Sequence, residues 1–318
     1  MPLSRRRFLI VAAAAALSAA EKMTSAERVE RALKGGDVDR VPFSFWHHFG
    51  DEALPATRHA ASTLEFHRKF RTDLIKVMSD YPYPKPKGKW YELRVEEDPF
   101  PEQIRALELV RDGLGAKAPF VETIFNPWNV AEKLSSKEAV MQLKSERPQA
   151  LLDALEAIAE SEAKHARKAI NAGASGIFLA IANAQSDILS PRDYAKFSEP
   201  FDRLVLDAAG GVPLNTLHLH GDKVYLDRFY KRWPAVSINY SSFATGIGIA
   251  RVRTNFSGLL MGGIDEINFK KLSMDEMQKQ AKSARSAAGK RFLLAPGCSV
   301  PNDTTDEEAM RLVKVAGA

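Results

Sequence analysis

The chain has 318 residues, of which 45% are hydrophobic and 27% are charged. This composition supplies enough apolar side chains for a sizeable core and excludes intrinsic disorder, while a single cysteine excludes an internal disulfide framework. The formal charge of +5 is spread along the chain without a basic patch interleaved with aromatic residues, so no nucleic-acid partner is expected.

The first 22 residues predict an export signal that precedes the folded domain. Ser4-Arg5-Arg6-Arg7-Phe8-Leu9 is followed by an apolar run and by small residues. That run is shorter than the roughly 20 residues that cross a membrane. The pattern resembles the twin-arginine signal, which implies export of residues 23–318 to the periplasm, with membrane contact only during export. The alternatives are a basic extension with no export role and translation from Met23, which would leave a cytoplasmic protein.

From Arg40 onward, short apolar or β-branched runs alternate with longer segments of helical periodicity. Eight strands are predicted: Val41–Phe49, Asp73–Ser79, Phe120–Phe125, Gly176–Ala182, Val212–Leu219, Val236–Tyr240, Leu259–Gly263 and Phe292–Ala295. Strands that alternate with helices favour a parallel sheet, and eight such units favour closure into one (β/α)8 barrel over residues 23–318. No Pro/Ser-rich linker indicates a second domain.

Capping patterns predict where several helices begin and end. Leu151, Leu155 and Ile158 have helical spacing, and Gly173 is expected to end that helix. The expected helix starts are Ser190-Pro191, Ser273 with Glu276, and either Thr304 with Glu307 or Thr305 with Glu308. The segment Tyr81–Arg94, rich in proline, lysine and tyrosine, is expected to form a long loop beside the site.

Active sites of (β/α)8 barrels lie at the carboxyl ends of the strands, where this chain has many polar residues. Asp80 and His47 are predicted to be catalytic, Asp80 by binding N–H groups or by moving a proton. Successive strand residues point to opposite faces, so at most one of His47 and His48 reaches the site. Asp80 and Asp265 also suit caps or turns. The residues predicted to bind substrate are Asn126, Asn183, Tyr240 and Asp265.

The most specific local pattern is His218-Leu219-His220. Residues two apart on a strand point to one face, so both imidazoles can enter the barrel mouth, and Cys298 follows the last predicted strand. Two imidazoles and one thiolate suit zinc, with a fourth position for water, substrate or a carboxylate. The alternative is that one histidine is a hydrogen-bonded core residue and Cys298 a small buried one. Candidate fourth ligands are Asp80, Asp265 and Glu266.

Several segments resemble the uroporphyrinogen decarboxylase superfamily. These are Asp39-Arg40-Val41-Pro42, Ser79-Asp80, Ser190-Pro191-Arg192-Asp193-Tyr194 through Pro200, Gly262-Gly263-Ile264-Asp265 and Pro296-Gly297-Cys298-Ser299-Val300-Pro301. The resemblance runs from about Thr24 to Ala318 and implies a single barrel of that superfamily's type.

The resemblance implies one of two chemistries. Decarboxylases of the superfamily use no cofactor and hold substrate carboxylates with arginines, but His47 and Asp51 stand at those positions here. The other branch transfers methyl groups and carries zinc on a His-x-Cys pair and a later cysteine. His218-Leu219-His220 and Cys298 resemble that pattern, with a histidine replacing the first cysteine. The resemblance therefore favours zinc-dependent methyl or alkyl transfer to a thiol or corrinoid-linked acceptor, with a corrinoid protein as a possible partner.

Two alternatives stay open. One is cofactor-free decarboxylation of uroporphyrinogen or another carboxylated substrate, centred on Asp80. The other is a non-catalytic exported protein that binds a small molecule in the barrel mouth.

Overall fold

The structure is a computed structural model that describes residues 22–50, 53–231 and 233–317. The predicted export signal lies, except for residue 22, outside the described residues, as does Asp51. No helix in the described part of the chain is long and apolar enough to cross a membrane.

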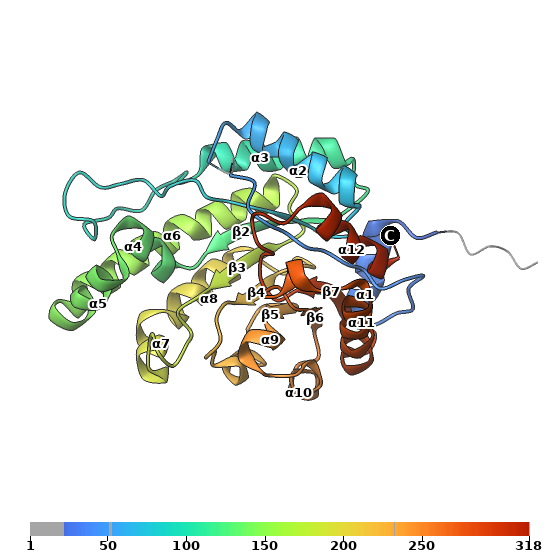
Figure 1. Cartoon of the computed structure of the whole chain (residues 1–318). Coiled ribbons are helices and arrows are strands. Elements are labelled where there is room, and N and C mark those ends of the chain that lie inside the picture. Colours follow the sequence, from blue (N-terminus) through green and yellow to red (C-terminus); the bar gives the residue numbers. More distant parts are fainter. Residues whose placement is uncertain (1–21, 51–52, 232, 318) are drawn as a thin grey trace, which may run out of the picture.

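Seven parallel strands form one sheet in which each strand pairs with the next along the chain (Figure 1). The strands are β1 (Ile75–Val77), β2 (Phe120–Phe125), β3 (Ile177–Ile181), β4 (Thr216–Leu219), β5 (Ser237–Tyr240), β6 (Leu259–Ile264) and β7 (Phe292–Pro296). These seven confirm the strands predicted from Asp73 onward, which differ only at their ends.

The prediction of a strand at Val41–Phe49 is wrong, because this segment forms only one parallel bridge, from Phe43 to Leu294 in β7. Pro42 has no N–H group to donate, although its carbonyl accepts from Leu294 at 2.9 Å. On the other side, the N–H of Asp73 donates to the carbonyl of Phe43 at 2.8 Å. The segment therefore connects β7 to the residues before β1, and the described sheet has seven strands instead of eight.

Most helices lie between strands and pack outside the sheet (Figure 1), whereas the first helix precedes the strands and contributes Val29 and Ala32 to the cluster on the inner side. The helices are α1 (Ser25–Lys34), α2 (Ala56–Phe70), α3 (Pro101–Leu114), α4 (Pro127–Leu134), α5 (Lys137–Glu146), α6 (Pro148–Asn171), α7 (Pro191–Phe197), α8 (Glu199–Ala208), α9 (Ser242–Thr245), α10 (Ile249–Asn255), α11 (Met274–Ala288) and α12 (Asp306–Ala316). Two short 3-10 helices are η1 (Leu226–Phe229) and η2 (Phe269–Lys271).

The predicted helix starts are confirmed. Ser190 caps α7 by accepting from the N–H of Asp193 at 3.0 Å. Complete capping boxes begin α11, at Ser273, and α12, where Thr305 rather than Thr304 is the cap. At the end of α6 the cap is Ala172, and Gly173 follows it.

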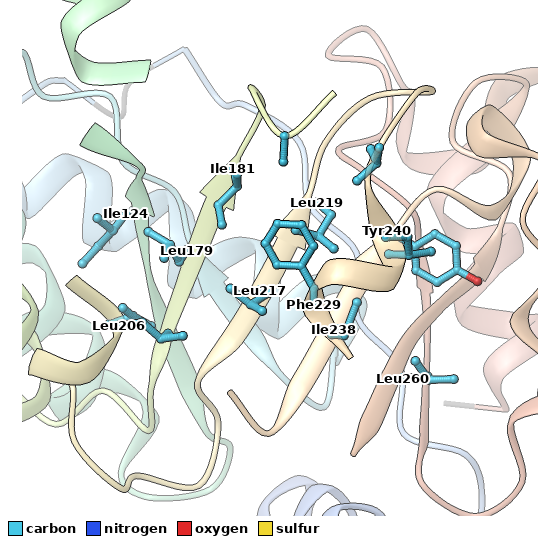
Figure 2. Packing of buried hydrophobic residues seen from close by; sticks show 14 of the residues in the cluster. Ile124, Leu179, Ile181, Leu206, Leu217, Leu219, Phe229, Ile238, Tyr240 and Leu260 are labelled. Atoms are coloured by element: carbon cyan, nitrogen blue, oxygen red, sulfur yellow. The ribbon is translucent and has the colours of Figure 1, made fainter. Parts of the chain in front are cut away.

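The two faces of the sheet carry different cores, as the period of two in a strand requires. On the outer face, Leu217 and Leu219 of β4 pack toward the helices with Phe229, as Figure 2 shows. On the inner face, Phe178 of β3 and Met261 of β6 belong to a separate cluster. His218 and His220, which alternate with the two leucines, therefore face the inner side.

The predicted loop at Tyr81–Arg94 contains no helix or strand. Tyr83 anchors it, because its ring is buried and its hydroxyl donates to Ser161 Oγ of α6 at 2.9 Å. Burial is the main reason that the pKa of Tyr83 rises to about 12. The loop thereby covers the outer side of the sheet near the carboxyl ends of β1 and β2.

Candidate metal centre and its cavity

Three side chains that can bind a metal converge where β4 and β7 end. Cys298 Sγ lies 3.4 Å from Nδ1 of His220 and 3.7 Å from Nε2 of His218. Their potential ligand atoms all lie within 4.8 Å of one another, and no other His, Cys, Asp or Glu in the described ranges joins this group. The structure thus brings together the three residues that the sequence grouped, without Asp80, Asp265 or Glu266 as a fourth.

The His218 ring is held in one orientation by Asn239 of β5. Asn239 donates from Nδ2 to the carbonyls of Met261 and Pro296, both at 3.1 Å, which fixes its amide. Its Oδ1 lies 2.6 Å from Nδ1 of His218 and can only accept. Nδ1 of His218 therefore carries a proton, and Nε2 is directed at Cys298, which is the orientation of a histidine prepared to bind a metal.

Electrostatics favour the thiolate form of Cys298. Burial acts to raise the pKa of this thiol, but hydrogen bonds and charge from His218 and His220 outweigh it and lower the pKa to about 4. In return, the hydrogen bond to Cys298 raises the pKa of His220. The thiolate is the form of cysteine that binds metals and reacts as a nucleophile.

Two glycines allow the chain to bring these side chains together. A Cβ on Gly297 would lie 2.3 Å from Cα of Ser241, so only glycine fits beside the start of α9. The N–H of Gly297 donates to Oε2 of buried Glu266 at 3.1 Å, which holds the turn before Cys298. Gly221, just after His220, has φ 114°.

The three side chains line a cavity of about 450 Å³, within the range of small-molecule sites. Its apolar walls include Trp46 and Phe178, and Nζ of Lys76 lies 5.7 Å and 5.0 Å from their ring centroids. The other lining residues are His48, Met78, Thr123, Phe125, Asn129, Glu132, Lys133, Lys137, Ala180, Ala182 and Ser299.

Residues 83–318 match the uroporphyrinogen decarboxylase (URO-D) family. The chain belongs to this family. Among curated proteins it is similar to two forms of methylcobamide:CoM methyltransferase MtaA from Methanosarcina barkeri, at 26% and 24% identity over 230 residues. Each alignment covers 69% of this chain and 64% of the relative, so the chain spans less than two thirds of the length of these relatives.

Solved structures show the same fold. A methyltransferase from Methanosarcina mazei superposes with a TM-score of 0.79 at 19% identity, covering 93% of this chain and 99% of the other. A B12-independent methionine synthase from a Shewanella species reaches a TM-score of 0.58 at 9% identity, covering 87% and 92%. Within the URO-D family, the chain therefore stands closer to the methyltransferases than to the decarboxylases.

The structure places two predicted substrate-binding residues away from the cavity. Asn126 is fully buried, and its Nδ2 donates to Asn183 at 2.8 Å, to Ser198 at 3.1 Å and to Asp202 at 2.9 Å. Asn183 also donates to Ser198, at 2.9 Å. We correct this prediction, because these amides join the ends of β2 and β3 to the junction of α7 and α8.

Tyr240 and Asp265 also have structural environments. Tyr240 lies on the outer face of β5 (Figure 2), where its hydroxyl donates to the carbonyl of Ile247 at 3.1 Å. Oδ1 of Asp265 accepts from the N–H groups of Ile267, at 2.9 Å, and Asn268, at 3.1 Å. Asp265 is therefore the turn residue that the sequence allowed as its alternative, and neither side chain lines the cavity.

Of the two adjacent histidines, His48 rather than His47 lines the cavity, which corrects the sequence-based choice. The His47 ring packs against Phe49 and Phe66 instead. Asp80 is half-exposed, and its carboxylate lies 3.4 Å from Nδ1 of His48 and 3.0 Å from Nζ of Lys133. The hydrogen bond from His48 is the main reason that the pKa of Asp80 falls to about 2, so its carboxylate is charged at neutral pH.

Sequence reasoning missed the cavity's Lys76, Trp46 and Lys133. Alternation along β1 could have found Lys76, because Ile75 and Val77 belong to an outer cluster and the residue between them must face inward. Trp46 and Lys133 lie in an irregular segment and on a helix, where no such rule applies.

Proposed function

We propose that this protein is a zinc-dependent enzyme that transfers a methyl or other alkyl group to a thiol or to a corrinoid-linked acceptor. The observation that carries this proposal is the convergence of His218, His220 and Cys298 at the edge of an apolar cavity. Thiolate and imidazole ligands suit zinc, and the donor set leaves room for a further ligand from the substrate.

Zinc held by these three residues would supply a Lewis acid that keeps a substrate thiol in its reactive thiolate form. The residues around it bind and orient the substrate. Trp46 and Phe178 supply apolar walls against which the substrate packs, and Asn239 keeps His218 in the ligating tautomer. His48, next to Asp80, is the group that we assign to accept the proton of an incoming thiol.

The relatives support the same class of reaction. The curated ones are named for transfer between methylcobamide and CoM, so we propose a corrinoid group, carried by a partner protein, as donor or acceptor here. Cofactor-free decarboxylation is the weaker proposal, because it gives no role to the metal-binding trio and because no arginine is found among the described residues that line the cavity.

Two further proposals concern the whole chain. We propose that residues 42–44, which bond to β7 and to Asp73, complete an eight-stranded barrel of the URO-D type. We also propose export by the twin-arginine route, which carries folded proteins and so suits a metal site that is loaded before export.

Metal content tests the main proposal. The purified protein should hold about one zinc per chain, and His220→Ala and Cys298→Ser should each lose it. His67→Ala, on α2 and outside the cavity, is the matched control and should keep the metal. The zinc-loaded protein should also alkylate thiols with a methylated corrinoid, and both ligand variants should lose this activity.

Two results would overturn the proposal. One is a parent protein that takes up no zinc after purification without chelator and exposure to excess metal. The other is thiol alkylation that is the same in Cys298→Ser as in the parent.

A further inference from the structure

A second cavity, of about 220 Å³, lies beside the one that holds the metal-binding trio. Thr123, Phe125 and Lys133 line both cavities and form the boundary between them. The second cavity is bounded by the loop that begins at Ser79 and by helices α4 and α6. None of the three metal-binding residues lines it. We call this space the side cavity.

The side cavity is lined by a buried carboxyl group with one oxygen that accepts no hydrogen bond from the described residues. Glu162 of α6 is 1% exposed, and its Oε2 has no hydrogen-bond partner among the described residues. Three residues along the same helix, His165 also lines the cavity and has an unpartnered Nδ1. Buried polar atoms are nearly always hydrogen-bonded, so two unpartnered groups in one cavity indicate a missing ligand.

The charges around Glu162 indicate the sign of that ligand. Burial, and then the nearby carboxylate of Asp202, raise the pKa of Glu162, while Lys133 acts weakly in the opposite direction. Lys133 is already paired with Asp80 at 3.0 Å, and His165 Nε2 lies 2.9 Å from Glu122. Lys133 and His165 are therefore both engaged by other acids, and a cation that enters the cavity would offset the burial and the Asp202 charge that favour the protonated form of Glu162.

The walls indicate the rest of the ligand. Aromatic and aliphatic side chains line much of the side cavity, namely those of Tyr83, Phe100, Ile124, Val130 and Leu134. An apolar cavity of about 150 Å³ already admits a benzene ring, so this one can hold a ring with a short polar arm.

We propose that the side cavity is a second ligand site, which binds a small organic amine as its cation. The ammonium group donates to Glu162, and the apolar body packs against Tyr83, Phe100 and Leu134. The amine enters beside Lys133, at the boundary with the metal cavity. A bound amine would therefore line part of the cavity in which the proposed substrate of the metal centre binds.

The test compares three probes that share a ring and differ in charge: benzylamine, benzyl alcohol and benzoate. Calorimetric titration of the full chain should show benzylamine binding about tenfold more tightly than benzyl alcohol, because a charged hydrogen bond is worth more than a neutral one. Glu162→Gln should weaken benzylamine binding by about tenfold. Glu160→Gln, exposed on the same helix, is the control and should change nothing.

Leu134→Phe narrows the same cavity and leaves Glu162 unchanged, so it replaces Glu162→Gln as the test if that variant does not fold. It should weaken the binding of both benzylamine and benzyl alcohol. Equal binding of all three probes, tightest binding of benzoate, or unchanged benzylamine binding in either variant would overturn the proposal. Cys298→Ser should bind benzylamine as the parent does, which separates this result from the fate of the proposed zinc chemistry.

Discussion

Two groups of polar residues follow strands of the same sheet, and their surroundings differ completely. His218 and Cys298 face a cavity and keep their ligating atoms directed at each other. Asn126 and Asn183 face the helices instead, and Asn126 donates both to Asn183 and to Asp202 of α8. Position at a strand end is therefore not enough to indicate function. The face on which the side chain lies decides whether a polar residue can meet a ligand.

The buried amide group should matter for stability and not for the metal. Asn126→Ala removes one buried side chain that donates to Asn183, Ser198 and Asp202, and leaves acceptors unpaired. We expect a loss of about 2–3 kcal/mol in the free energy of unfolding, measured in urea, with zinc content unchanged. Cys298→Ser should show the opposite pattern, with zinc lost and the free energy of unfolding of the metal-free protein little changed. If Asn126→Ala lost zinc while its free energy of unfolding stayed unchanged, the buried amides would not differ in role from the metal-binding trio.

The second prediction concerns a residue that supports the trio without joining it. Asn239→Ala removes the acceptor that holds the proton on Nδ1 of His218. Loss of such a partner typically lowers metal affinity by about 10- to 100-fold. A competitive chelator titration measures this, and Asn255→Ala, exposed on α10, is the control. Unchanged zinc affinity in Asn239→Ala would mean that the ring needs no such support.

Much of this arrangement could be predicted from the sequence, because alternation along a strand is a strict rule. For His218 and His220 the rule predicts that both side chains enter the barrel mouth, and the structure brings both to the cavity. The same rule excludes Tyr240, which shares a face with Ile238, and Asn126, which shares one with Ile124. Only their position at a strand end favours Tyr240 and Asn126 as substrate-binding residues, and that position does not say which face their side chains occupy.

Other features depend on contacts that no local pattern encodes. Residues 42–44 make a single bridge instead of a strand. Their backbone hydrogen bonds run to Leu294 on one side and to Asp73 on the other, and the tertiary fold rather than the local sequence places these two partners. The choice between His47 and His48 depends on where this irregular segment turns. The side cavity arises from the packing of a loop on α6, whose path is determined by Tyr83 and Ser161.

The third prediction is a slope in the pH dependence of stability to which buried Asp202 should contribute. Burial, against hydrogen bonds from Asn126, Tyr194 and Ser198, raises the pKa of Asp202 from 3.8 to about 7. Between these values the folded protein binds more protons than the unfolded chain. The contribution to stability is therefore complete below pH 3.8 and is lost as the pH rises through 7.

For one group this slope is at most about 1.4 kcal/mol per pH unit. Urea unfolding at several pH values between 5 and 8 should show a smaller fall in stability for Asp202→Asn than for the parent. Asp207→Asn, exposed on the same helix, should follow the parent curve. If Asp202→Asn keeps the full slope, the carboxyl group of Asp202 in the parent titrates as an ordinary exposed acid does. Asp202 and the two asparagines would then not form a buried, hydrogen-bonded cluster that differs from the metal-binding trio.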